Sequence, residues 1–114
     1  MDQRLEKALD FSNYMVTLNN QKRVLTEQFK QDIIHYYCGG QFTVTQELIS
    51  FCHTLVSSMQ TTTVLIDDNN MPIEILDLKA FLEEILSKYF ESSNKYFNEY
   101  TKLKNNRSVE GIIE

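Results

Sequence analysis

Glycine and proline are scarce in this chain of 114 residues, which contains three Gly and one Pro. Few positions therefore break a helix or favour a tight turn, and such a composition is typical of helix-rich folds. Trp is absent, so the candidate core depends on seven Phe, six Tyr and the aliphatic side chains. With 42% hydrophobic and 24% charged residues, the composition is that of a globular domain rather than of a disordered segment.

A net positive charge and long apolar runs are also missing. The net charge of −5 argues against a general polyanion-binding protein. No apolar run reaches the roughly 18 residues that a membrane-spanning helix needs, so we expect no membrane association. The chain has two cysteines and its first residues lack the pattern of a secretory leader, which predicts a reducing, cytoplasmic location in the producing or host cell.

Motifs that carry catalysis are few. The sequence has no glycine-rich phosphate loop and no nucleophile elbow. Glu83 and Glu84 form a carboxylate pair, but they lie opposite an apolar stripe, where charges usually face solvent. We therefore expect no catalytic residue and no cofactor, and a protein that is not an enzyme.

The first long segment predicts a helix from Asp2 to Tyr37, which ends at Cys38-Gly39-Gly40. Asn19-Asn20 is its weakest point and leaves open a break into two helices. Steps of three and four residues define a stripe, hereafter the Ala8–Tyr36 stripe: Ala8, Phe11, Met15, Leu18, Lys22, Leu25, Phe29, Asp32 and Tyr36. A helix of this length spans about 54 Å. It would extend beyond a compact domain with a radius of gyration of about 13 Å, which favours an elongated bundle or an oligomer.

The rest of the chain predicts a shorter helix, a hairpin and a second long helix. Thr45 is a good N-cap for a helix to Met59, with an apolar face of Leu48, Phe51, Cys52, Leu55, Val56 and Met59. Residues 61–76 are rich in β-branched residues around the turn signal 67–70, and predict a β-hairpin in which Pro72 begins a strand or lies at an edge. Residues 41–44 predict a short strand or an extended linker. Asp77 is a good cap for a last helix to about Lys104.

The expected fold is therefore mainly α with minor β. It comprises two long amphipathic helices, one shorter helix and a small β-hairpin near 61–76. We expect a single domain over 1–104 and a short C-terminal tail over 105–114.

Four residues come nearest to a metal constellation: His35, Cys38, Cys52 and His53. His35 and Cys38 share a face of a helix, but the adjacent Cys52 and His53 would point about 100° apart. We therefore expect no metal site, and we expect buried Cys with partly exposed His. The run 67–70 resembles part of a calcium loop, but it lacks the Gly and Glu that such a loop requires at positions six and twelve, so a hairpin turn is the better interpretation.

Basic and aromatic residues alternate near the end of the last predicted helix. The set is Lys95, Tyr96, Tyr100, Lys102, Lys104 and Arg107. Such a set can bind single-stranded nucleic acid by stacking and charge. The alternative, which we favour, is that the aromatic residues complete the helix stripe and the cations complement the helix dipole.

The C-terminal tail combines apolar and acidic residues. Val109, Ile112 and Ile113 lie between Glu110 and Glu114. Such a segment docks on a partner or packs on its own chain, and the sequence favours neither alternative.

The function favoured by the sequence is a non-enzymatic interaction or assembly protein. It would form a homo-oligomer, or bind a protein partner, by burying the Ala8–Tyr36 stripe, and Lys22 and Asp32 would set the register. A small nucleic-acid accessory protein is the alternative. No family motif is recognisable, although the short, Asn-rich composition resembles that of small accessory proteins of large bacteriophages.

Overall fold

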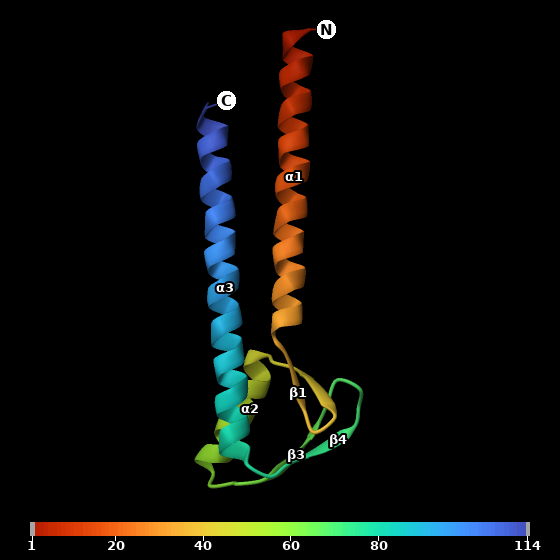
Figure 1. The fold of residues 1–114 in the computed structure, drawn as a ribbon, viewed down its shortest axis with the longest axis vertical. Helices are drawn as coiled ribbons and strands as arrows, with labels where there is room; N and C mark the ends of the chain where they lie inside the picture. The colour runs from red at the N-terminus through yellow and green to blue at the C-terminus, as the bar shows by residue number, and fades with distance from the viewer. Residues whose placement is uncertain (1, 114) are drawn as a thin grey trace. The chain divides into compact units, whose positions relative to one another are not determined.

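The computed structural model describes residues 2–113, and the side chains of residues 2–105. The elements in chain order are α1 (Gln3–Asp32), β1 (Ile34–Tyr37), β2 (Gly40–Thr43), α2 (Gln46–Ser57), β3 (Thr63–Ile66), β4 (Pro72–Ile75) and α3 (Leu78–Ile113) (Figure 1). The strands form two separate antiparallel hairpins, β1–β2 and β3–β4. The fold is mainly α with minor β, as the sequence predicts.

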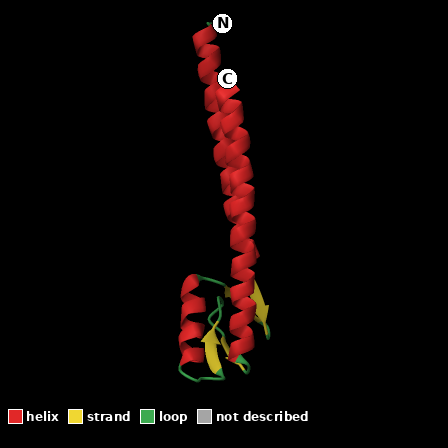
Figure 2. Cartoon of the chain, turned by 90° about the vertical axis from the view of Figure 1, so that its left-hand side faces the viewer, coloured by secondary structure: helices red, strands yellow, loops and turns green. Residues whose placement is uncertain are grey.

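The chain divides into two compact units. The helix-pair unit comprises Met1–Gln28 and Lys95–Glu114, and the core unit comprises Phe29–Asn94. Within the helix-pair unit, α1 and α3 run side by side in opposite directions (Figures 1 and 2). The core unit contains both hairpins, α2 and the first turns of α3.

The predicted continuation of the first helix to Tyr37 is wrong, because α1 ends at Asp32 and residues 34–37 form β1. These residues are β-branched or aromatic and pair with β2, and the N–H of Val44 continues the ladder by donating to the Ile33 carbonyl at 2.8 Å. Cys38 and Gly39 connect the strands with φ values of 47° and 80°. Two positive φ values match the type I′ turn that suits a two-residue hairpin, so Gly39 forms part of a hairpin turn rather than the end of a helix, and Gly40 begins β2. Asn19-Asn20 does not interrupt α1.

The local signals for the other elements are confirmed. The Thr45 side chain accepts a hydrogen bond from the N–H of Leu48 at 3.1 Å, as an N-cap of α2 should. Pro72 begins β4, where it lies opposite Ile66. The Asp77 side chain accepts a hydrogen bond from the N–H of Ala80 at 3.1 Å at the start of α3. The helix then continues to Ile113, beyond the predicted end near Lys104.

Ten apolar side chains are buried among those that the structure describes, and all ten belong to the core unit: Ile33, Phe42, Val44, Cys52, Leu65, Ile73, Ile75, Leu78, Phe81 and Ile85. Phe81 of α3 makes edge-to-face contacts with Tyr37 and Phe42 at centroid distances of 5.3 and 5.5 Å. The start of α3 therefore packs against the hairpins. The predicted apolar face of α2 is only partly correct, because Cys52 is buried whereas Phe51 and Met59 are exposed.

Two aspartates join the hairpins at the outer edge of β2. The Asp67 carboxylate accepts hydrogen bonds from the N–H groups of Gln41 and Met71 at 3.0 and 2.8 Å. Asp68 accepts from the N–H and hydroxyl of Thr43 at 3.2 and 2.6 Å. The N–H groups of Gln41 and Thr43 point away from β1, so these carboxylates occupy the places that a third strand would take. Hydrogen bonds from the backbone of Gln41, Met71 and Asn69 lower the pKa of Asp67 against the opposing effect of burial.

Candidate interaction surface

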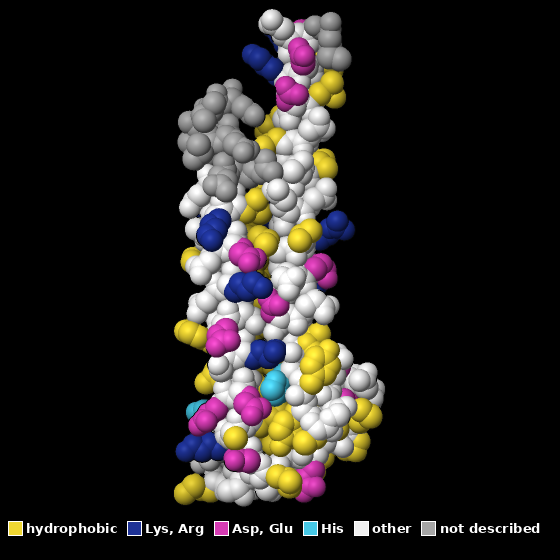
Figure 3. All heavy atoms as spheres, in the orientation of Figure 1, with side chains coloured by type: hydrophobic (Ala, Val, Ile, Leu, Met, Phe, Trp, Pro, Cys, Tyr) yellow, Lys and Arg dark blue, Asp and Glu magenta, His cyan; other side chains and the backbone are white. Residues whose placement is uncertain are grey.

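The helix α1 has 30 residues and buries none of them. The core unit, by contrast, encloses every fully buried apolar side chain of the described part of the chain. Apolar side chains nevertheless lie at the surface of α1, between polar and charged ones (Figure 3). The helix-pair unit therefore lacks a closed core of its own among its described side chains.

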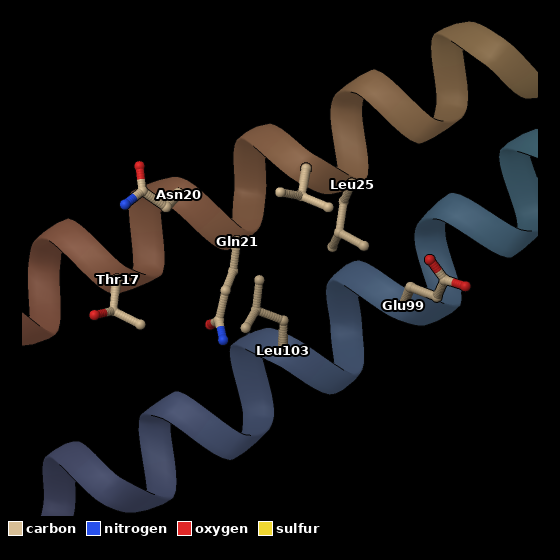
Figure 4. Close-up of a pocket in the computed structure, with 7 residues that line it drawn as sticks. Thr17, Asn20, Gln21, Leu25, Glu99 and Leu103 are labelled. Atoms are coloured by element: carbon tan, nitrogen blue, oxygen red, sulfur yellow. The ribbon is translucent and has the colours of Figure 1, made fainter.

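Specific contacts hold α3 against one face of α1. The hydroxyls of Thr26 and Tyr96 lie 2.9 Å apart, and the Lys22 ammonium lies 5.8 Å from the centre of the Tyr100 ring. Thr26 also donates a hydrogen bond to the Lys22 carbonyl at 3.0 Å, so Tyr96 is the donor to Thr26. Beside these contacts runs an open groove lined by Thr17, Asn20, Gln21, Val24, Leu25, Glu99 and Leu103. The side chains of Gln21, Leu25 and Leu103 point into the space between the helices (Figure 4).

The structure distributes the Ala8–Tyr36 stripe over three environments. Leu18, Lys22 and Leu25 are half-buried in the helix-pair unit. Phe29 and Asp32 are half-buried in the core unit, where Phe29 contacts Tyr89 at 6.1 Å and the Asp32 carbonyl accepts a hydrogen bond from Ser92. Ala8, Phe11 and Met15 are exposed, Phe11 by 64%. Tyr36 is 70% exposed on β1 rather than on a helix, so the stripe ends at Asp32.

A second apolar set on α1 was not singled out from the sequence. Leu5, Leu9 and Val16 are 53%, 46% and 57% exposed. At about 100° per residue, each lies about 160–180° around the helix from Leu25. This face points away from the one that carries the half-buried Leu18 and Leu25. The sequence does show this set, because Leu5, Leu9 and Val16 follow one another at steps of four and seven residues. The Ala8–Tyr36 stripe is longer and contains more apolar residues, so it was the stronger prediction.

The nucleic-acid candidates are only partly available at the surface. Lys95, Lys102 and Lys104 are exposed, whereas Tyr96 and Tyr100 are half-buried. The two tyrosine rings contact each other edge to face at 6.4 Å, and both interact with α1. Their rings therefore take part in helix pairing. The side chain of Arg107 lies outside the described residues.

The metal candidates are not gathered into one site. His35 makes a 3.2 Å contact with Glu84 and an edge contact with Phe81. Cys52 is buried, and desolvation raises the pKa of its thiol, which disfavours the thiolate that a metal would need. Cys38 and His53 are exposed, and both cysteines are free thiols. The described part of the chain has no group of three or more His, Cys, Asp or Glu residues placed to hold a metal ion.

Val109, Ile112 and Ile113 belong to the helical backbone of α3, and their side chains lie outside the described residues.

A further surface depression in the core unit is lined by His35, Ala80, Glu83, Glu84, Ser87, Lys88 and Glu91. Glu83 and Glu84 are exposed there, in keeping with a solvated face.

No family model, curated protein or solved structure matches this chain. Within the described residues, no helix combines the length and apolarity required to cross a membrane.

Proposed function

We propose that this chain is a non-enzymatic assembly protein whose helix-pair unit associates with another polypeptide, a second copy of the chain, through α1. The observation that carries the proposal is the contrast between the two units. The core unit has buried apolar side chains on both hairpins, on α2 and on α3, whereas α1 has no buried residue over its full length.

The physical reason is that helices gain most of their stability in proteins from burial of an apolar face. Within one chain, α1 packs beside α3 along a single face, and large apolar side chains such as Leu5, Leu9 and Val16 stay in water. Association that covered them would be stabilised by roughly 25 cal/mol for each Å² of apolar surface removed from water. The core unit would then serve as a self-sufficient domain attached to an assembling pair of helices.

The seam that we propose lies on another face of α1 than the Ala8–Tyr36 stripe. Lys22 and Thr26 already contact α3 of the same chain, and Leu25 lines the groove beside them. Association would therefore use the N-terminal half of α1 on the face of Leu5, Leu9 and Val16, whereas the exposed Phe11 of the original stripe lies about 160° around the helix from Leu9.

Solution mass tests the proposal. Light scattering on a sizing column, over a range of protein concentrations and at low and high salt, should give a mass at least twice that of the 13.4 kDa chain. An apolar interface should persist at high salt, whereas binding driven by phosphate contacts would weaken steeply. A mass of one chain at every concentration would refute the proposal.

A further inference from the structure

We propose that the second copy packs its α1 antiparallel against this α1 through one heptad stripe on the face opposite to Leu25. This inference rests on the proposed function and specifies its partner, its surface and its orientation. The stripe, hereafter the Leu5 stripe, consists of Asp2, Leu5, Leu9, Ser12, Val16, Asn19 and Arg23.

The spacing of the Leu5 stripe is that of a helix–helix seam. Its members follow one another in alternating steps of three and four residues, which is the heptad repeat of helices packed along their length. All seven side chains are exposed in the structure. From Asp2 to Arg23 the stripe extends about 32 Å along the helix. It therefore offers a continuous surface with three apolar side chains near its centre.

The charges of the stripe favour antiparallel over parallel packing. Asp2 lies at its N-terminal end and Arg23 at its C-terminal end. In a parallel, in-register pair, each of these residues would face its own copy, and like charges would meet at both ends. In an antiparallel pair, Asp2 lies next to the end that carries Arg23 of the second copy, so opposite charges meet at both ends.

The apolar side chains fit the same arrangement. When successive layers of two antiparallel helices are matched, Leu5 lies opposite Val16 of the second copy and Leu9 lies opposite Ser12 of the second copy. The small Ser12 makes room for Leu9 near the symmetry axis. Asp2 then lies opposite Asn19 of the second copy, and a polar pair at each end of a seam fixes its register.

The partner is a second copy because the stripe complements itself. Reversing its direction places Leu5 opposite Val16 and Asp2 opposite Asn19, and brings the acidic end of each copy near the basic end of the other. Such matching is what a two-fold interface requires, since the same patch is used by both subunits. The α3 helix leaves these apolar side chains uncovered, because the half-buried Leu18 and Leu25 lie about 140–180° around α1 from Leu5, Leu9 and Val16.

Disulfide trapping distinguishes the two orientations. In a C38S background, which removes the exposed native thiol, the variants Leu5→Cys and Val16→Cys are prepared separately and then mixed under mild oxidation. An antiparallel interface should cross-link Leu5→Cys chains to Val16→Cys chains. It should not cross-link Leu5→Cys chains to one another, because copies of that position lie about 16 Å apart along the helix axis. Lys7→Cys is the matched control, since it lies about 200° around the helix from Leu5 and should not cross-link to Val16→Cys.

The outcomes separate this inference from the proposed function. The antiparallel interface is supported if a covalent dimer forms in the mixture of Leu5→Cys and Val16→Cys chains, but not in the Leu5→Cys sample or in the Lys7→Cys control. Cross-linking of Leu5→Cys chains with one another means a parallel interface, and no cross-linking in a sample that light scattering shows to be oligomeric means another surface. Both results overturn this inference and leave the proposed function standing. A sample that is monomeric by light scattering overturns both.

Discussion

The hydroxyl groups of Thr26 and Tyr96, 70 residues apart in the sequence, hydrogen-bond at 2.9 Å between α1 and α3. Because Tyr96 donates to Thr26 and Thr26 donates to the Lys22 carbonyl, the two helices are joined through a short chain of hydrogen bonds. Together with the half-buried Leu18 and Leu25, this contact shows that α3 covers part of α1.

Loss of this contact should weaken the helix pair. We expect Thr26→Val to lower the free energy of unfolding by about 0.5–1.5 kcal/mol, because the half-buried Tyr96 hydroxyl loses its acceptor. Urea unfolding followed by circular dichroism measures the change, with Thr17→Val on the exposed part of the same helix as control. A double-mutant cycle with Tyr96→Phe should show coupling, and strictly additive effects would mean that the hydrogen bond does not form.

The carboxylate of Asp67 should make stability depend on pH. Backbone hydrogen bonds hold its pKa below the usual value, so its stabilising contribution is complete above about pH 4, the pKa of an unfolded Asp, and is lost as pH falls through the native pKa. Asp67→Asn should therefore lower the melting temperature at pH 7, because an amide cannot accept all the N–H groups of Gln41, Asn69 and Met71. The difference from the native chain should shrink as the pH is lowered below 4.

The matched control for this pH effect is Glu74→Gln, which removes an exposed carboxylate from β4 nearby. It should change the melting temperature little at either pH. A difference between the native chain and Asp67→Asn that stays constant from pH 7 to pH 3 would contradict the assigned role of the Asp67 carboxylate.

The two glycines of the first hairpin should respond differently to substitution. A Cβ on Gly40 would lie 2.7 Å from Cγ1 of Ile73, a buried side chain with little room to move, so Gly40→Ala should cost about 1–3 kcal/mol. Gly39 faces open space but has a φ of +80°, which Asn tolerates better than most residues, so Gly39→Asn should fold with a smaller loss. Thermal unfolding of the two variants measures both effects, and equal losses would contradict the packing argument at Gly40.

Local signals in the sequence predicted much of this fold. Thr45 and Asp77 mark the starts of α2 and α3, and Pro72 marks the start of β4, because each acts on a backbone within a few residues of itself. The strand β1 could not be predicted in this way. Its residues continue the helical spacing of α1, and they form a strand because Ile33 and its successors pair with residues that follow the turn.

The candidate surface was also predictable only in part, because it too depends on contacts with residues far away in the sequence. The sequence of α1 contains the Ala8–Tyr36 stripe and the Leu5 stripe, and periodicity alone does not tell which one the chain covers. The half-burial of Leu18 and Leu25 and the contact of Lys22 with Tyr100 decide which one is covered, and they depend on α3 residues more than 70 positions later. Similarly, nothing local indicated that Asp67 and Asp68 would cover the edge of β2.

The central claim is that the uncovered face of α1 joins two copies of the chain. The most direct test is light scattering on the native chain, on Leu9→Gln and on Asp10→Gln, which place the same side chain at neighbouring exposed positions about 100° apart on the helix. The account predicts a dimer for the native chain and for Asp10→Gln, and a shift towards monomer for Leu9→Gln at the same concentration. A monomeric native chain, or a Leu9→Gln variant that dimerises as well as Asp10→Gln, would contradict it.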